Sequence, residues 1–576
     1  MVTAPASFAQ QGPIRLFPPT DPRSTPAPDA IPDQERALPP GERAEPGLPP
    51  TVAPPEFVVE GLAAPEVDAI GLAQSGGGFD HALWQGSDPE VLHALLSGLP
   101  VVTEVPPLRR LARRLLVSAS PVAGSDGRLL RARSARLVAM GDLDAAEMLL
   151  DQLPPMASDS DLARSAAEVA LLLGEQDRAC QLADSIGPTT TAEFWGKVGV
   201  YCRLAAGDTE GARLGLDLLR EARQTADTAF FALASAIVDE AEAPPSQSLP
   251  RPSTIHVALL ALADWPLPPE ALAGAPPSVL AAVTREPALA GAHALAVTEQ
   301  AFLVGAVPAD RLAALYAERA DGDTTDVMWQ IRSNWNADSR ALAYNALRDE
   351  RDPLARAQLL DALWRAAGGA ERFLVAEVFA APLADLPTER GFAGMAPSVG
   401  RALLAADRLV PAGRWLSLLT AEAREDARLR NAASSMAPLF ALAGIGGSDA
   451  VPRLDAAAID AWTPAADDDG TAAERLLAML EGVGAPVEGE VWARLLPAHA
   501  NRRASAPASA LWRGLEDAAG GRRVGETVLY VLTMLDGRPQ AAHPEALVAS
   551  LRALRQVGLD PDARAIAVAT ALIDGG

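Results

Sequence analysis

The sequence predicts an all-α protein: an α-solenoid of stacked antiparallel helical hairpins that follows a disordered, Pro-rich N-terminal segment. Three observations lead to this fold class. Apolar residues recur at the three- and four-residue steps of an amphipathic helix from Asp88 onward. A 33-residue period runs through residues 105–240, and the first 55 residues hold 15 of the 49 prolines. With 576 residues, 49 % of them hydrophobic, the chain is long enough for several domains or one long repeat array.

The N-terminal part is expected to lie outside any core. Adjacent proline pairs in residues 1–55 favour extended polyproline conformers, so we interpret this segment as a disordered tether. Small residues at Ser7 and Ala9 suit a cleavage site, which makes the segment the possible remnant of a signal peptide; an accident of Ala-rich composition is the alternative. Residues 56–87 are predicted to be an extended arm in which Gly76-Gly77-Gly78 forms a flexible joint.

Capping residues mark the expected helix starts. Asp88-Pro89, Asp352-Pro353 and Asp560-Pro561 each place a capping carboxylate before a proline that suits the first helical position. Thr190 with Glu193 fits a capping box. These signals indicate helices in both halves of the chain.

The most informative pattern is the repeat. Three columns keep the period of 33: Gly141, Gly174 and Gly207; Ala146, Ala179 and Ala212; and Leu153, Ile186 and Leu219. Each unit is predicted to be a hairpin whose first helix ends at the glycine, which can adopt a left-handed conformation. The small alanine lets the second helix approach the first, and the large apolar residue closes the core. Each hairpin leaves an apolar face that the next unit covers.

In these columns the chain resembles tetratricopeptide repeat (TPR) proteins, in which a Gly-acidic turn is followed five residues later by Ala. The resemblance covers about residues 105–240 and implies stacked hairpins that bind a protein or peptide. The period is one residue shorter than the TPR length of about 34, and the aromatic and terminal Pro positions are mostly unfilled. Ankyrin repeats have a similar length, but their Thr-Pro-Leu-His element is absent here.

Composition divides the helical part into two arrays. Residues 88–242 carry the TPR-like repeats, and the Pro- and Ser-rich residues 243–253 are interpreted as a linker. Residues 254–576 are predicted to form a second helical-hairpin array without a clean period.

Cys180 and Cys202 are the two cysteines of the chain. They fall on the second helix of one predicted unit and the first helix of the next, which are neighbouring elements. In an exported protein we expect a disulfide that clamps the two units. In a reducing compartment the same residues are two buried thiols, and the sequence leaves both alternatives open.

Charge and composition argue against several function classes. A formal net charge of -25 repels phosphate backbones, so no nucleic-acid partner is expected. No stretch approaches the roughly 18 apolar residues of a membrane-spanning helix, so no integral membrane span is expected. The six histidines are scattered, which argues against a metal site. No cofactor is expected either: a P-loop needs Gly-Lys-Ser/Thr, and the only lysine lies in Gly196-Lys197-Val198.

We therefore expect a non-enzymatic scaffold without catalytic residues that binds a protein or peptide partner in the bacterial cell envelope, periplasmic or exported. First-helix side chains would form the groove. The candidate contact residues are Arg136, Glu168, Phe194, Trp195, Lys197 and Arg203. Trp329 and Trp335 form a second candidate surface, because aromatic residues dominate interface hot spots. The alternatives are an all-helical hydrolase that acts on the cell wall and a cytoplasmic regulatory adaptor with reduced thiols.

Overall fold

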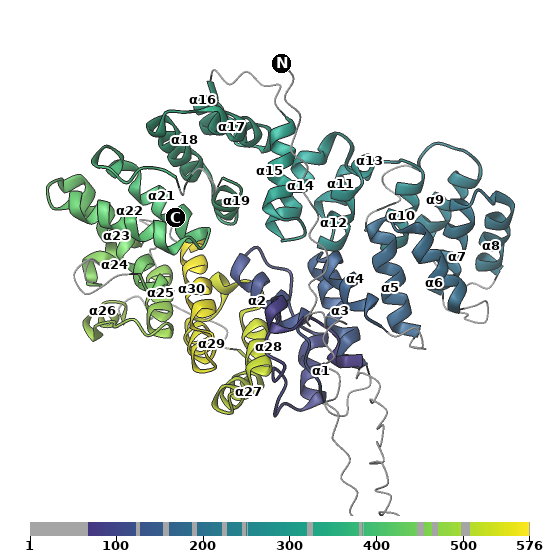
Figure 1. Cartoon of the computed structure of the whole chain (residues 1–576), viewed down its shortest axis with the longest axis horizontal. Coiled ribbons are helices and arrows are strands. Elements are labelled where there is room, and N and C mark those ends of the chain that lie inside the picture. Colours follow the sequence, from purple (N-terminus) through teal and green to yellow (C-terminus); the bar gives the residue numbers. More distant parts are fainter. Residues whose placement is uncertain are drawn as a thin grey trace, which may run out of the picture. The chain divides into compact units, whose positions relative to one another are not determined.

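Helices make up the described part of the chain (Figure 1). The computed structural model describes residues 67–122, 127–153, 160–186, 193–221, 227–244, 249, 251–319, 326–379, 383, 385–445, 454–463, 470–496 and 507–574. Within these ranges the only β-type pairing is an isolated bridge between Leu72 and Ser118. The predicted all-α class is thus confirmed, whereas the predicted tether at residues 1–55 lies outside the described residues.

Fifteen of the described α-helices lie between residues 89 and 318. They are α1 (Pro89–Ser97), α2 (Pro106–Val117), α3 (Arg128–Met140), α4 (Leu143–Asp151), α5 (Ser160–Leu173), α6 (Gln176–Ile186), α7 (Glu193–Ala205), α8 (Thr209–Glu221), α9 (Thr228–Val238), α10 (Thr254–Leu262), α11 (Pro269–Ala273), α12 (Pro277–Arg285), α13 (Pro287–Ala290), α14 (Ala294–Leu303) and α15 (Ala309–Glu318).

The chain continues in the same way from residue 327 onward. Its described helices are α16 (Val327–Ser333), α17 (Ala337–Asp349), α18 (Pro353–Ala366), α19 (Glu371–Val378), α21 (Ala396–Ala405), α22 (Leu409–Ala423), α23 (Ala427–Ala443), α24 (Ala456–Trp462), α25 (Thr471–Gly482), α26 (Gly489–Ala493), α27 (Ser509–Gly520), α28 (Val524–Leu535), α29 (Pro544–Gln556) and α30 (Asp560–Asp574). Short 3-10 turns lie at Val67–Ala69, Gln74–Gly76, Gly291–His293, Arg390–Met395 and Pro539–Ala541.

Two of the predicted helix caps form as expected. The Asp88 carboxylate accepts a hydrogen bond from the N–H of Glu90, and the Asp352 carboxylate accepts from two N–H groups at the start of α18. Asp560 differs, because it is the first residue of α30 and its carboxylate accepts hydrogen bonds from Arg555 and Arg564. Thr190 of the predicted capping box lies outside the described residues.

The three repeat glycines end the first helices of three successive hairpins, α3–α4, α5–α6 and α7–α8. Gly141, Gly174 and Gly207 have φ of 80°, 77° and 74°, the left-handed conformation that L side chains rarely adopt. The repeat alanines Ala146, Ala179 and Ala212 are fully buried, so each second helix approaches its partner closely. Each hairpin then packs on the next: α4 contacts α5, α6 contacts α7, and α3 also contacts α5. This arrangement is that of stacked helical hairpins.

Helices on the two sides of residues 243–253 are in contact with each other. α10, the first helix after these residues, packs on α5, α7 and α9, and α12 packs on α3 and α5. The turn at Gly141 is so close to this second group that an added Cβ would stand 2.7 Å from the Ala306 Cβ and from the Pro277 carbonyl oxygen.

The described part of the predicted arm is held by a buried arginine. Arg133 of α3 is 0 % exposed and donates hydrogen bonds to the carbonyl oxygens of Asp68, Ile70, Leu116 and Ser118. The Asp68 carboxylate in turn accepts from the N–H groups of Gly127 and Leu130 at the start of α3. Because buried backbone carbonyls need donors, Arg133 fixes the path of the arm against α2 and α3.

The N-terminal helices pack directly against the C-terminal ones (Figure 1). α1 contacts α28, and α2 contacts both α28 and α30. The Gly525 N–H donates to the Leu83 carbonyl at 3.1 Å, and the Thr103 hydroxyl donates to the Gly537 carbonyl. The 33-residue period gave no sign of this closure.

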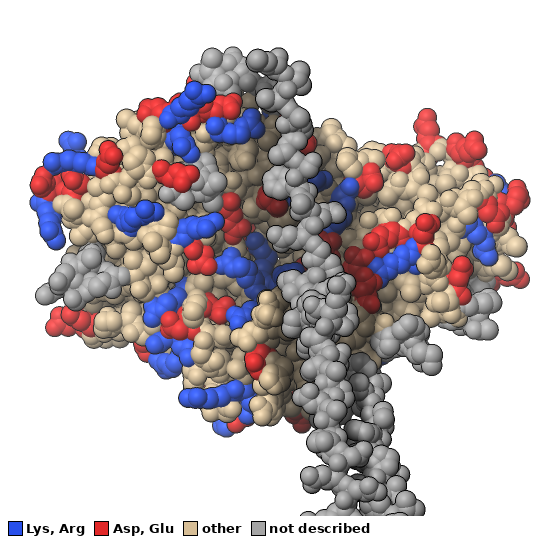
Figure 2. All heavy atoms as spheres, in the orientation of Figure 1, with Lys and Arg blue, Asp and Glu red and all other residues tan. Residues whose placement is uncertain are grey.

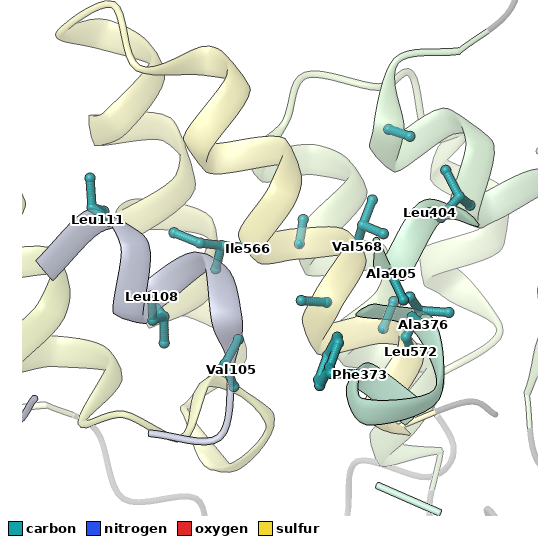
Figure 3. Close-up of a cluster of buried hydrophobic side chains, with 14 of the residues drawn as sticks. Val105, Leu108, Leu111, Phe373, Ala376, Leu404, Ala405, Ile566, Val568 and Leu572 are labelled. Carbon is teal, nitrogen blue, oxygen red and sulfur yellow. The ribbon is translucent and has the colours of Figure 1, made fainter. Parts of the chain in front are cut away.

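Apolar side chains from four helices meet where α2 reaches α30 (Figure 3). The buried residues there are Val105, Leu108 and Leu111 at α2, Phe373 and Ala376 of α19, Leu404 and Ala405 of α21, and Ile566, Val568 and Leu572 of α30. Burial of one such large side chain stabilises a fold by about 1.5–3 kcal/mol. The contact between the two ends of the described chain is therefore a true hydrophobic core.

Candidate functional site

A disulfide bond joins Cys180 of α6 to Cys202 of α7. The two Cα atoms are 5.7 Å apart, within the range that an unstrained disulfide spans. The bond connects the second helix of one hairpin to the first helix of the next. It therefore crosses the interface between two stacked units rather than closing a loop inside one of them.

Three of the predicted groove residues lie on the first helices of consecutive hairpins. Arg136 of α3 is half-buried. Glu168 of α5 forms an ion pair with Arg164 at 3.0 Å, and the Arg164 guanidinium lies 4.9 Å from the ring centre of Phe194 on α7. The structure thus brings Glu168 and Phe194 to one side chain, Arg164, which the sequence reasoning did not single out.

The other three predicted groove residues have different surroundings. Trp195 and Lys197 are buried in α7, and the Phe194 and Trp195 rings pack edge to face. Arg203 is exposed and lies over α8, where an added Cβ on Gly215 would stand 2.9 Å from its Nη1. These six residues therefore do not form one continuous exposed row.

Lys197 is the centre of a polar network between α7, α9 and α10. Its Nζ lies 2.6 Å from Glu193 Oε1 and 2.8 Å from Asp227 Oδ2. His256 Nε2 lies 3.0 Å from the Asp227 carboxylate, and His256 Nδ1 accepts a hydrogen bond from the Ser253 N–H. An Nδ1 that accepts cannot carry a proton, so Nε2–H is the donor to Asp227. The network joins three helices and commits the only lysine of the chain to internal contacts.

The pKa values of this network follow from its burial and hydrogen bonds. Burial works to raise the pKa of Asp227, but hydrogen bonds from Lys197 and from the Phe230 N–H outweigh it, and the pKa lies below its ordinary value. Burial lowers the pKa of His256 despite the neighbouring Asp227 carboxylate. The stable form is thus an ionised Asp227 beside a neutral His256.

Trp329 and Trp335 have unequal surroundings. Trp329 on α16 is 55 % exposed. Trp335 is half-buried, its Nε1–H donates to Glu371 Oε2 at 2.8 Å, and the Arg340 guanidinium lies 4.8 Å from its ring centre. Trp335 is therefore tied into the protein core, and Trp329 alone of this pair presents most of its surface.

A small cavity lies where the N-terminal and C-terminal helices meet. Its volume is about 200 Å³, and its lining residues come from α2, α21, α22, α23, α30 and the turn before α22. The lining is mostly apolar: Pro107, Leu404, Ala405, Leu409, Ala443, Pro561, Ala565, Val568 and Ala569. Leu404, Ala405 and Val568 can be followed in Figure 3. We refer to this cavity as the junction pocket.

Four charged residues complete the junction pocket: Arg110, Asp407, Asp560 and Arg564. Arg564 is held by internal contacts, because it donates to Asp560 and to carbonyl oxygens of Leu442 and Val483. Arg110 is half-exposed and lies 3.9 Å from Glu377 Oε1 and 3.9 Å from Asp407 Oδ2, beyond hydrogen-bond distance. Among the described residues none accepts a hydrogen bond from Arg110, so its N–H groups are available to an incoming acceptor.

The acidic side chains around Arg110 have shifted pKa values. Burial raises the pKa of Glu377, against the pull of Arg109 and Arg110. Burial likewise raises the pKa of Asp562, against Arg114 and Arg110. For Asp560, burial is outweighed by the hydrogen bonds from Arg564 and Arg555, and its pKa is lowered.

Both signs of charge are interspersed over the molecular face shown in Figure 2.

The sequence reasoning missed the junction pocket. Arg110 and Arg564 are 454 positions apart in the chain, and neither belongs to a motif. The one available signal was the predicted helix start at Asp560-Pro561, which marks the beginning of α30 but not its packing against α2. Only the closure of the helices brings these residues together.

Comparison of the chain with known family models, curated proteins and solved structures finds no significant match. The likeness to TPR proteins therefore remains a prediction from sequence. Within the described ranges, no helix has the length and apolar character needed to cross a bilayer. The same ranges contain no group of three or more His, Cys, Asp or Glu side chains placed to hold a metal ion.

Proposed function

We propose that this protein is a non-enzymatic, TPR-like helical-repeat scaffold that binds a protein or peptide partner in the bacterial cell envelope. The observation that carries this proposal is the junction pocket: an apolar cavity beside Arg110, whose N–H groups have no acceptor among the described residues. Recognition sites for peptides commonly combine an apolar cavity with a few polar groups that fix orientation.

The junction pocket is suited to one aliphatic side chain of a partner. Its volume of about 200 Å³ is below the roughly 300–1,000 Å³ of pockets that enclose a whole small ligand. Leu409 is 40 % exposed at the pocket, and the adjacent Val410 is 79 % exposed. A partner would bury these side chains as well, and an acceptor group on it would bind Arg110.

The experiment uses a photo-crosslinking amino acid at Leu409 in the native cells. We expect a partner peptide that crosslinks at this position, and we expect Ala565→Leu, which fills the pocket, to abolish the crosslink. Ala565→Ser is the size-matched control and retains it. A crosslinker at Leu214 on α8, a leucine that is more exposed than Leu409 (62 % against 40 %), controls for non-specific capture. The proposed binding site is contradicted if the crosslinking yield at Leu409 is no higher than the yield at Leu214. It is also contradicted if the crosslink at Leu409 persists in the Ala565→Leu variant.

The envelope location is supported by the disulfide between Cys180 and Cys202, since disulfides persist in oxidising compartments. Alkylation of thiols in intact native cells tests it. Cysteines that resist the reagent until a reductant is added agree with export. Immediate alkylation of both cysteines supports the cytoplasmic adaptor instead.

A further inference from the structure

A second recess lies between the first helices of the two C-terminal hairpins, α27–α28 and α29–α30. Two adjoining cavities of about 190 and 570 Å³ share the residues Trp512, Glu516 and Glu545. We call them together the C-terminal groove. The helix contacts here repeat those of α3, α4 and α5: α27 contacts α28, α28 contacts α29, and α27 also contacts α29.

The lining residues of this groove follow the spacing of helix faces. On α27 they are Trp512, Leu515, Glu516 and Ala519, at steps of three and four residues. On α29 they are Glu545, Val548, Ala549, Arg552, Ala553 and Gln556, which also lie on one face of their helix. Two parallel stripes with an apolar floor form a cleft of the kind in which amphipathic helices bind.

The rim of the groove carries negative charge beside an aromatic ring. Glu516 and Glu545 are exposed, and among the described residues neither carboxylate has a hydrogen-bond or ion-pair partner. Trp512 is half-buried and lines both cavities together with these two residues. A cation over a tryptophan ring is attracted by the negative face of the ring, and two carboxylates add to this attraction.

Two arginines also line the groove, but they do not cancel the negative charge of its two glutamates. Arg552 is neutralised by an ion pair with Glu481 at 3.0 Å. Arg513 is exposed at the outer cavity. His543 caps α29, because its Nδ1 accepts a hydrogen bond from the Glu545 N–H. The two carboxylates without an ion-pair partner, Glu516 and Glu545, thus outnumber the one exposed guanidinium, Arg513.

We infer that the C-terminal groove binds a basic amphipathic helix of the partner, with a Lys or Arg side chain on Trp512 between Glu516 and Glu545. The aliphatic residues of that helix lie on Val548, Ala549 and Ala553. The net charge of -25 favours such a cationic partner at longer range. The inference rests on the proposed scaffold function and names the chemistry of the partner that the scaffold holds.

The test measures binding of labelled helical peptides to the full chain by fluorescence anisotropy. The first peptide is an amphipathic helix of Leu, Ala and Lys in which the Lys residues flank the apolar face. In the second peptide every Lys is replaced by Gln. In the third peptide every Lys is replaced by Glu. We expect the Lys peptide to bind at least about tenfold more tightly than the Gln peptide, and the Glu peptide to bind weakest. Salt should weaken the Lys peptide most.

Matched variants locate the binding. Glu516→Gln with Glu545→Gln should weaken the Lys peptide by about tenfold, which corresponds to about 1.4 kcal/mol, and Trp512→Leu should weaken it as well. Glu210→Gln with Glu270→Gln changes the net charge equally at two other exposed positions and should leave binding unchanged.

Equal binding of the Lys and Gln peptides, or an equal loss in the control variant, overturns the inference. Crosslinking at Leu409 in cells is measured separately in the Glu516→Gln/Glu545→Gln variant. A crosslink that persists there while the Lys peptide shows no preference means that the scaffold function stands and the basic helix is wrong.

Discussion

Arg109 Nη1 donates a 2.6 Å hydrogen bond to the carbonyl oxygen of Leu303, 194 positions further along the chain. The same nitrogen donates to the Thr103 carbonyl at 3.0 Å. The guanidinium fits against Gly305, where an added Cβ would stand 2.4 Å from Arg109 Cδ. Burial lowers the pKa of Arg109 to about 10, so it remains charged at neutral pH. This one side chain fixes the start of α2 to the end of α14.

The first prediction concerns this link. Arg109→Met should lower the free energy of unfolding by about 1–3 kcal/mol, because two partly buried carbonyls lose their donor. Arg113→Met on the same helix is the control: its ion pair with Asp142 is on the surface and contributes less than about 1 kcal/mol. Chemical denaturation measures both. An equal effect of the two variants would show that the Arg109 hydrogen bonds do not matter.

The disulfide gives a second prediction. Cys180 and Cys202 are separated by 22 residues, and closing a loop of that length restricts the unfolded chain by about 3 kcal/mol in the entropic model. A Cys180→Ser/Cys202→Ser variant should therefore unfold at lower denaturant concentration. Adding reductant to the wild type should have a similar effect, while reductant should not change the double variant. A wild type that is indifferent to reductant contradicts the prediction.

His256 gives a third prediction, on pH. Its pKa in the folded protein lies below the ordinary 6.5, so below pH 6.5 the unfolded chain binds a proton that the folded protein excludes. The free energy of unfolding should fall as the pH drops through this window and level off below the folded pKa.

In a His256→Gln variant the loss of stability between neutral pH and about pH 5 should be smaller, as followed by thermal denaturation at each pH. His81→Gln removes a largely exposed histidine and serves as the control with a wild-type profile. An unchanged pH profile in His256→Gln would rule out this histidine as the group responsible.

The fourth prediction concerns a buried ion pair. Arg340 of α17 donates to both carboxylate oxygens of Glu299 on α14, at 2.9 and 2.5 Å, and both side chains are less than 10 % exposed. Tyr316 also donates its hydroxyl to Glu299. Arg340→Met leaves Glu299 buried without its counter-charge and should destabilise the protein by about 3–5 kcal/mol.

Restoring neutrality should recover much of that loss. In Arg340→Met/Glu299→Gln no charge is buried, so the double variant should be more stable than Arg340→Met alone, with thermal denaturation as the measurement. If Arg340→Met is no less stable than the double variant, the cost does not come from the unpaired Glu299 carboxylate.

The helical repeat was predictable where its turns use glycine. Gly141, Gly174 and Gly207 can take positive φ at no steric cost, so each leaves a mark in the sequence. Further along, Asp407 and Arg522 take the same left-handed position, with φ of 57° and 53°, at the turns before α22 and α28. The glycines that take positive φ in this part, among them Gly305, Gly444, Gly484 and Gly558, are unevenly spaced, so the second array shows no clean period.

The candidate contact residues were less predictable. Helical spacing placed Lys197 and Trp195 on a first helix, but it could not show that α9 and α10 would cover that face. Asp227 binds Lys197 from the start of α9, and His256 of α10 binds Asp227 in turn. No motif links these residues in the sequence. The same holds for Trp335, whose indole is held by Glu371.

The sequence by itself determined the local structure of this protein: helical periodicity, capping carboxylates and repeat glycines specify all-α hairpins, because these signals act over a few residues. The tertiary structure alone decided that α2 packs against α30, that Arg110 and Arg564 line one pocket, and that Trp512, Glu516 and Glu545 line one groove. Such relationships depend on how hydrophobic faces far apart in the chain are matched. That choice is made by packing summed over many helices, which no short segment encodes.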